Sequence, residues 1–267
     1  MSVKYVHGYT EREARRLEDQ ANTLTELLHH DSFWSPGDLI LEAGCGVGSQ
    51  TKIVAAQNPE SKFISIDISN ESLQKAKKLI ASMELKNVTI EEADIFNLPY
   101  PDAYFDHILV CFVLEHLSNY SAALIELKRV LKPGGSIMLI EGDHGSTYFH
   151  PDSDYAYAAI QCQIELQKRD GGDANIGRKL YPILRKAGFK RIRVTPKMVY
   201  ADDSRPQLVE GFTKNTFTAM IEGVRESAIR NKLISSVQFD KGIADLYRTA
   251  ENDGVFCYTF FKGIGVK

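Results

Sequence analysis

The chain has 267 residues, of which 43% are hydrophobic and 25% are charged, values typical of an ordinary globular protein. A formal net charge of −3 provides no general attraction to nucleic acid, and no apolar run approaches the roughly 20 residues of a membrane span. The N-terminus lacks the apolar core of a secretory signal, and the 4 cysteines are scattered without a Cys-x-x-Cys pair. We therefore expect a cytoplasmic protein with no membrane span, no nucleic-acid partner, no disulfide framework and no bound metal.

The first predicted element is an amphipathic helix. Thr10 and Glu13 have the spacing of a capping box, and apolar residues then recur at helical intervals as far as Leu28. Tryptophan, proline and glycine within residues 34–37 end this helix. We interpret residues 1–36 as a helical cap.

Strands and helices alternate through the next hundred residues. Strands are predicted over residues 39–43, 62–67, 88–92, 105–111 and 136–141, with helices over residues 49–57, 69–83 and 120–131. Strands that alternate with helices of this length predict a parallel sheet that is covered on both faces.

The second half of the chain is less regular. We expect a helix over residues 175–187, a strand over 189–195, a mostly helical pattern over 205–250 and a last strand over 255–263. The predicted fold is thus a Rossmann-like, doubly wound α/β fold with a mostly parallel seven-stranded sheet and a helical insertion before the last strand. One domain is the simplest partition, with a cap (1–36), a core (37–198), an insertion (199–253) and a final strand (254–267).

The glycine-rich turn after the first strand is the most informative segment. Gly44, Gly46 and Gly48 let the backbone approach a ligand where a Cβ would collide. The helix that follows offers free N–H groups at its start, which usually hold phosphates. Glu42, however, would repel a pyrophosphate and attract a cationic group. The turn therefore suits a nucleoside that carries positive charge better than a dinucleotide.

This turn resembles the first motif of the class I S-adenosylmethionine (SAM) dependent methyltransferases, acidic-x-Gly-x-Gly-x-Gly. Asp67 ends the second strand, at the distance from the glycines where an acid binds both ribose hydroxyls in methyltransferases and in dinucleotide-binding folds alike. The run from Asp94 through Leu98-Pro99 to Phe105-Asp106 is similar to a further family stretch that dinucleotide binding does not require.

The resemblance implies SAM as cofactor, S-adenosylhomocysteine (SAH) as product and a set of binding residues. Asp94 would accept from the adenine amino group, Ile95 would offer a backbone N–H to the ring, and the backbone near Cys111 would support the methionine portion. Tyr9 would lie in a segment that folds over the cofactor, although a frayed terminus with an aromatic anchor is an equal alternative. The complete set is Tyr9, Glu42, Gly44, Cys45, Gly46, Gly48, Asp67, Ile68, Asp94, Ile95, Cys111 and Phe112.

Three residues are candidates for catalysis on the acceptor: His116, His144 and Tyr148. Histidine titrates near neutral pH, so His116 could orient or deprotonate an acceptor, or it could simply start a helix. His144 and Tyr148 fall in a polar stretch after the fifth strand, which we interpret as a loop that lines the acceptor pocket; a solvated loop is the alternative.

The function expected from these features is methyl transfer from SAM by in-line displacement to an unidentified, small-molecule acceptor. Two alternatives are a non-catalytic SAM-binding or sensing protein and a nicotinamide-dependent oxidoreductase. The latter normally has Gly-x-Gly-x-x-Gly, and here Ser49 occupies the place of the third glycine. We expect a monomer or a homodimer.

Overall fold

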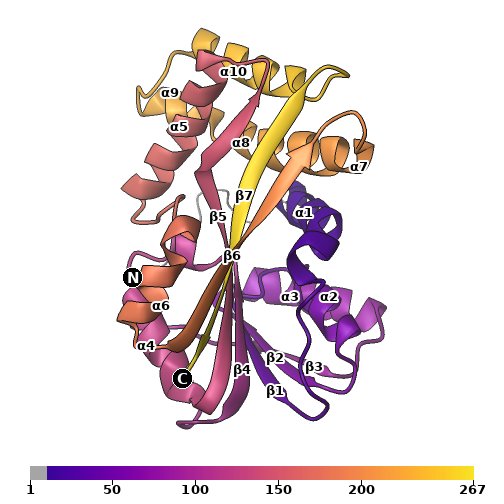
Figure 1. The fold of residues 1–267 in the computed structure, drawn as a ribbon, viewed down its shortest axis with the longest axis vertical. Helices are drawn as coiled ribbons and strands as arrows, with labels where there is room; N and C mark the ends of the chain where they lie inside the picture. The colour runs from indigo at the N-terminus through magenta and orange to yellow at the C-terminus, as the bar shows by residue number, and fades with distance from the viewer. Residues whose placement is uncertain (1–10) are drawn as a thin grey trace.

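The computed structural model describes residues 11–267, with side chains from Arg16 onward, and arranges the strands in one seven-stranded sheet (Figure 1). The strands are β1 (Leu39–Ala43), β2 (Lys62–Asp67), β3 (Val88–Glu92), β4 (Phe105–Cys111), β5 (Leu131–His150), β6 (Lys190–Ala201) and β7 (Val255–Val266). Their order in the sheet is β3-β2-β1-β4-β5-β7-β6. The predictions for Tyr9, Thr10 and the Glu13 side chain lie outside the described residues.

The helices surround this sheet. They are α1 (Glu11–His29), α2 (Thr51–Gln57), α3 (Asn70–Ser82), α4 (Tyr120–Val130), α5 (Asp154–Arg169), α6 (Leu180–Lys186), α7 (Pro206–Leu208), α8 (Ala219–Gly223), α9 (Arg225–Arg230) and α10 (Ser236–Arg248), with 3-10 turns η1 (Leu114–His116) and η2 (Gly177–Lys179) and a π-helix η3 (Val209–Thr218). None of the described helices combines the length and apolar character needed to cross a membrane.

The parallel half of the sheet confirms the predicted fold class. β1 pairs in parallel with β2 and β4, and β4 pairs in parallel with β5, while β7 lies antiparallel between β5 and β6. Helices α2 and α3 lie on one face and α4 and α6 on the other (Figure 1). Most residues of the central strands β1 and β4 are buried, which explains why these strands read as nearly continuous apolar runs, whereas the edge strand β3 is only partly buried. The observed bounds of β1 to β4 are those expected.

The fifth strand corrects the prediction. A strand over residues 136–141 followed by a loop was expected, but β5 runs from Leu131 to His150. Beyond a register shift between Asp143 and Tyr148, it continues antiparallel to β7, with His150 opposite Val255. Figure 1 shows β5, β6 and β7 continuing past the parallel strands toward α5 and α7 to α10. The distant partner strand β7 satisfies the backbone of this polar stretch and makes it a strand.

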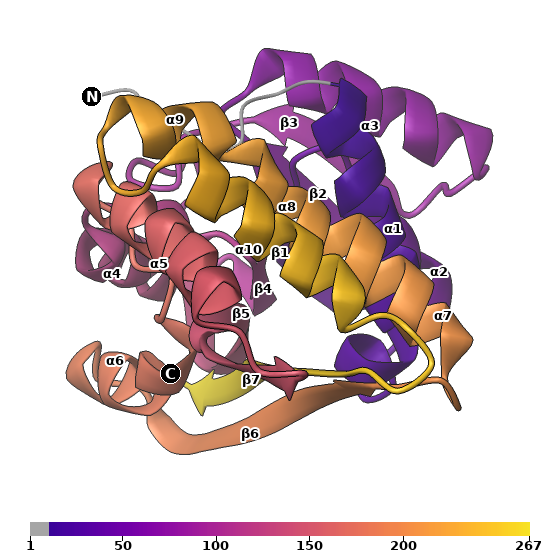
Figure 2. The same ribbon diagram turned by 90° about the horizontal axis from the view of Figure 1, so that it is seen from above.

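Two helical segments also differ from the prediction. Helix α5 was missed, although Ser153 caps it by accepting a hydrogen bond from the Ala156 amide at 3.1 Å. The expected helix over residues 175–187 consists of the turn η2 and the short helix α6. Within the helical region after β6, η3 is a π-helix that packs along α1 (Figure 2). Such helices are rare and occur frequently at functional sites.

A buried polar network ties α1 to the sheet and to the start of α2. Lys262 of β7 is only 2% exposed, and its Nζ donates to the Leu28 carbonyl at 3.0 Å and to Ser32 Oγ at 2.9 Å. His29 contacts Ser32 Oγ through Nδ1 at 3.1 Å and Gln50 Oε1 through Nε2 at 2.8 Å. Because Gln50 directly precedes α2, this network fixes α1 relative to the glycine turn.

His29 should make the folded protein acid-sensitive. Burial lowers the pKa of His29 from its ordinary 6.5 to about 4. As the pH falls below 6.5, His29 therefore becomes protonated in the unfolded chain, whereas in the folded protein it stays neutral until about pH 4. The free energy of unfolding is thus highest above this window and falls across it, by about 3 kcal/mol in total. Urea unfolding at a series of pH values measures the slope.

The variant His29→Gln removes this titration, so it should lose that part of the slope whatever its absolute stability. His30→Gln changes an exposed neighbouring histidine and should retain the slope of the parent protein. An unchanged slope in His29→Gln would contradict the assignment.

Candidate functional site

The glycine turn connects β1 to α2. Gly44, Gly46 and Gly48 have φ angles of 84°, 53° and 84°, in the left-handed region that favours glycine. A Cβ on Gly44 would lie 2.4 Å from Val113 Cγ2, so this position has no room for a side chain. A Cβ on Gly46 would meet nothing within 4 Å. The backbone at Gly46 therefore borders open space in which a ligand can lie.

Asp67 reaches this turn from the end of β2. Its Oδ2 accepts a hydrogen bond from the Gly46 amide at 2.8 Å, and its Oδ1 accepts one from the Ser69 amide at 2.8 Å. Each carboxylate oxygen has further acceptor capacity. Ile68 follows with half of its apolar side chain exposed. The structure thus places an acid and an exposed apolar side chain beside the glycine turn, as expected.

Glu42 has a different environment from the one that the motif suggested. Its side chain is 2% exposed, and Oε2 accepts hydrogen bonds from Thr51 Oγ1 at 2.6 Å and Ser65 Oγ at 2.7 Å. Burial raises the pKa of this carboxyl, although the two hydroxyl donors oppose the shift. Glu42 therefore ties β1 to β2 and to α2, and in this structure it holds the turn in place.

The ends of β3 and β4 carry the remaining predicted binding residues. Asp94 is exposed and accepts a hydrogen bond from the Phe96 amide at 2.9 Å, while Ile95 is partly buried. Cys45 and Cys111 are buried, and burial raises the pKa of both thiols well above the usual range. Both therefore behave as small, protonated side chains.

Phe112 marks the point where the chain leaves β4. Its φ of 59° lies in the left-handed region, which is uncommon for a bulky residue. Its amide donates to the Ile140 carbonyl at 2.8 Å, and its ring lies 5.5 Å from that of Phe260. Backbone strain of this kind clusters at functional sites.

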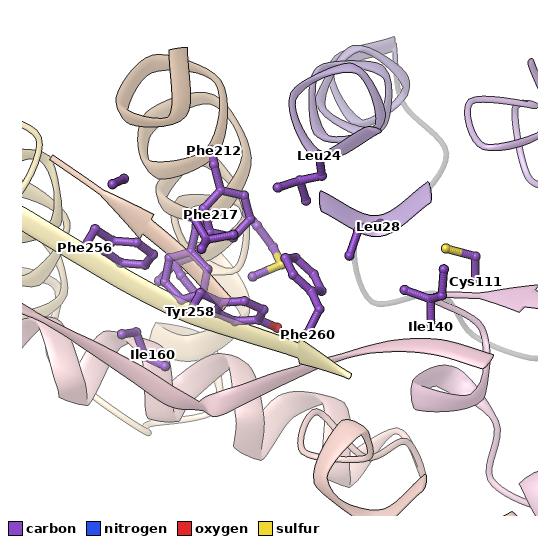
Figure 3. Packing of buried hydrophobic residues seen from close by; sticks show 14 of the residues in the cluster. Leu24, Leu28, Cys111, Ile140, Ile160, Phe212, Phe217, Phe256, Tyr258 and Phe260 are labelled. Atoms are coloured by element: carbon purple, nitrogen blue, oxygen red, sulfur yellow. The ribbon is translucent and has the colours of Figure 1, made fainter. Parts of the chain in front are cut away.

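A cavity of about 60 Å³ lies next to Phe112. Its walls come from α1, the segment after β4, β5, η3, α8 and β7, and Figure 3 shows the rings from η3 and β7 gathered together. The lining residues are Arg16, Leu17, Gln20, Phe112, Glu115, His116, Gly142, His144, Phe212, Thr216, Phe217, Met220, Tyr258 and Phe260. The cavity is thus largely aromatic, with a few polar groups.

Two polar pairs face this cavity. His144 Nδ1 lies 2.7 Å from Tyr258 Oη, and burial lowers the pKa of His144 while it raises that of Tyr258. Both side chains are therefore neutral near pH 7. His116 Nε2 lies 3.7 Å from Glu115 Oε1, and Gln167 Nε2 donates to Glu115 Oε2 at 3.2 Å. A histidine beside a carboxylate is a suitable proton acceptor.

Glu141 of β5 binds the backbone of the segment that carries His116. It is fully buried, and its Oε1 accepts from the Val113 amide at 3.1 Å and the Leu114 amide at 2.8 Å. Burial and the nearby charge of Glu115 raise the pKa of Glu141 well above its usual range. Glu141 therefore holds the start of η1, and with it His116.

The structure brings His116 and His144 together at the cavity but leaves Tyr148 outside. Tyr148 is half exposed, and its hydroxyl lies 3.3 Å from Met198 Sδ of β6. The expected pocket loop is instead a strand, and the register shift after Asp143 changes which side chains face inward. Tyr148 is therefore wrong as a pocket residue.

Sequence reasoning missed the walls that α1, η3 and α8 provide. The helical spacing of residues 205–250 was visible, but nothing local indicates which residues of that region meet Phe112. The missed lining residues on these three elements are Arg16, Leu17, Gln20, Phe212, Thr216, Phe217 and Met220, and Gly142, Tyr258 and Phe260 of β5 and β7 were missed as well.

Comparison with known proteins adds a family. Residues 35–188 match a family model described as a methyltransferase domain. An uncharacterized 37.1 kDa protein in transposon Tn4556 of Streptomyces fradiae is 33% identical over 191 residues, which cover 70% of this chain and 54% of that protein. A demethylmenaquinone methyltransferase of Symbiobacterium thermophilum is 35% identical over 112 residues, 41% of this chain and 45% of that protein. The chain spans about half the length of the curated relatives it matches.

Among solved structures, a phosphoethanolamine N-methyltransferase 2 of Haemonchus contortus in complex with SAM shares the fold. It superimposes with a TM-score of 0.57 at 16% identity, over 93% of this chain and 52% of that one.

Proposed function

Because this chain belongs to the class I SAM-dependent methyltransferases, we propose that it transfers a methyl group from SAM to a small-molecule acceptor held in the aromatic cavity. The glycine turn follows the carboxyl end of β1, Asp67 ends β2, and Phe112 follows β4. In open α/β sheets, ligands collect at this edge. One observation supports this function most. The backbone at Gly46 borders open space and is bonded to Asp67, and the cavity lies farther along the same edge of the sheet.

The cofactor would lie along this edge. Asp67 suits the ribose hydroxyls, Ile68 suits the face of the adenine, and Asp94 with the Ile95 amide suits its amino edge. The strained backbone at Phe112 would support the methionine portion. In this position the sulfonium methyl group would point toward the cavity. Glu42 contributes by holding the turn that these contacts need.

Methyl transfer is an in-line displacement in which the nucleophile, the methyl carbon and sulfur must align. The positive charge leaves sulfur as the bond to carbon breaks, so no oxyanion develops on the donor. Most of the acceleration must therefore come from positioning, which provides roughly 7–11 kcal/mol in well-oriented systems. His116, beside Glu115, is the group that would take a proton from an acceptor that arrives protonated.

Ligand binding tests the donor assignment. In a thermal-shift experiment on the full chain, SAH at 100 times its dissociation constant should stabilise the protein by about 2.7 kcal/mol, whereas NAD should not. Stabilisation by NAD and not by SAH would overturn the assignment in favour of an oxidoreductase.

Transfer tests the activity. Incubation with methyl-labelled SAM and a small-molecule extract should move label into an extract component. Binding of SAM without any transfer of label would indicate the non-catalytic SAM-binding alternative.

A further inference from the structure

His144 presents an unused hydrogen-bonding atom to the cavity. Its side chain is about 5% exposed, and Nδ1 contacts Tyr258 Oη at 2.7 Å. Within residues 16–267, no hydrogen bond joins its Nε2 to another protein atom. Nε2 is not among the fully enclosed atoms that lack a partner, and His144 lines the cavity, so this atom is open to it.

The surroundings of Tyr258 decide which nitrogen of His144 carries the proton. The phenol keeps its own proton, because burial raises the pKa of Tyr258 well above its usual range. Within residues 16–267, His144 Nδ1 is the one hydrogen-bond partner of this buried hydroxyl, so the phenol O–H, which would otherwise lack an acceptor, donates to it. We therefore assign the imidazole proton to Nε2, which makes this atom a hydrogen-bond donor toward the cavity.

The neighbouring residues hold this donor rigidly. Arg178 binds both oxygens of Asp143 at 2.6 Å, which fixes the strand beside the tyrosine. A Cβ on Gly142 would lie 2.4 Å from Tyr258 Oη. Glycine at this position therefore leaves room for the Tyr258 hydroxyl beside the backbone of β5. A preorganised donor in a water-poor site is worth more than one in solution.

The walls around the donor restrict what can accept from it. Phe112, Phe212, Phe217, Tyr258 and Phe260 contribute aromatic rings to the cavity. A buried donor without a partner is energetically costly, so a ligand that supplies an acceptor atom there is favoured. An ammonium group could pair with the Glu115 carboxylate on the cavity wall, but it has no acceptor and would leave Nε2–H without a partner. An oxygen on a flat, apolar body matches both the donor and the rings.

We propose that the methyl acceptor is a flat conjugated molecule with a phenolic or enolic hydroxyl, whose oxygen accepts a hydrogen bond from His144 Nε2. This substrate class rests on the proposed methyltransferase function. The hydroxyl proton passes to His116, and the N–H of His144 stabilises the oxyanion that remains. An electron pair on that oxygen then forms the bond to the methyl carbon, while the C–S pair stays on sulfur and leaves neutral SAH.

The volume of the cavity shows how such a molecule must enter. A cavity of about 60 Å³ is smaller than the roughly 150 Å³ that admits benzene. The cavity as it stands therefore has room only for the oxygen-bearing edge of the acceptor. A whole ring can enter only if the residues that cover the cavity move apart. Met220 of α8 forms part of that roof beside the π-helix η3, and methionine adapts readily to new neighbours.

Calorimetry on the full chain saturated with SAH tests the proposal with two probes of the same shape, 1-naphthol and 1-naphthylamine. The parent protein should bind the naphthol at least tenfold more tightly. His144→Phe should abolish this preference and leave SAH affinity unchanged, while His144→Gln, which retains an N–H donor, should restore part of it. His150→Gln alters an exposed histidine at the far end of the same strand and should behave as the parent.

Three results would overturn the proposal while leaving methyltransferase function intact: tighter binding of the naphthylamine, an unchanged preference in His144→Phe, or binding of neither probe to the SAH complex. Should His144→Phe fail to fold, the comparison of His144→Gln with Tyr258→Phe replaces it. Tyr258→Phe should weaken the preference severalfold, because Nδ1 then lacks the donor that fixes the tautomer, and an unchanged preference there counts against the proposal. Failure of the parent protein to bind SAH would remove the proposed function itself.

Discussion

Replacement of Asp67 by alanine should raise the dissociation constant for SAM about 100-fold. The carboxylate accepts hydrogen bonds from the Gly46 and Ser69 amides, each at 2.8 Å, and in the proposed cofactor position it would also accept from the ribose hydroxyls. A hydrogen bond to a charged group contributes about 1.5–3 kcal/mol, and a factor of 100 in affinity corresponds to about 2.7 kcal/mol. Calorimetric titration of SAH and SAM into the folded variant measures the effect.

Glu92→Ala is the matched control for this change. Glu92 ends the neighbouring strand β3, is exposed and accepts from Asn70 Nδ2 at 3.0 Å, so its loss should leave cofactor affinity within about twofold of the parent. An Asp67→Ala protein that binds SAM as tightly as the control would place the cofactor elsewhere.

Replacement of His116 by alanine should lower turnover at least 100-fold while cofactor affinity stays within about twofold. A positioned general base typically contributes a factor of about 10² to 10⁴, and His116 lines the cavity beside Glu115. Its contribution arises only when the acceptor loses its proton, so kcat should fall without a change in SAH binding. Release of SAH with a saturating acceptor, together with calorimetry, separates the two quantities.

His107→Gln provides the comparison for His116. His107 lies in β4 and contacts Ser136 Oγ at 2.8 Å, away from the cavity lining, so both turnover and affinity should be retained. An equal loss of SAM affinity in Asp67→Ala and His116→Ala would refute the division between a residue that binds the donor and one that serves the acceptor.

The parallel half of the fold and the approach of Asp67 to the glycine turn were predictable because their signals are local. Strands buried on both faces read as short apolar runs, and the turn at Gly44 to Gly48 needs φ angles that only glycine adopts easily. The apolar run of β2 ends just before Asp67, so the sequence alone places Asp67 at the end of that strand. Each of these features lies within a few residues of its cause.

The acceptor side was predictable only in part, because its causes lie far apart in the chain. The stretch around Asp143 and His144 is polar, and it forms a strand because the distant strand β7 pairs with it, while Arg178 and Tyr258 bind its side chains. Helix α5, by contrast, carried a readable signal in Ser153.

The cavity walls gave no comparable local signal. The ring of Phe212 lies 5.7 Å from that of Phe260, and the ring of Phe217 lies 5.4 Å from that of Tyr258. These contacts join η3 to β7, which is far away in the chain, so no local pattern indicates them.

The long strands β5, β6 and β7 have a consequence for how such an enzyme diversifies. They extend beyond the part of the sheet that carries the glycine turn (Figure 1), and β5 and β7 contribute residues to the aromatic cavity. Helices η3 and α8, in the segment between β6 and β7, cover part of this cavity. That segment supplies none of the groups proposed to hold the donor. Under the proposed function, substitutions in that segment would change the acceptor that the protein takes without altering the groups that hold the donor.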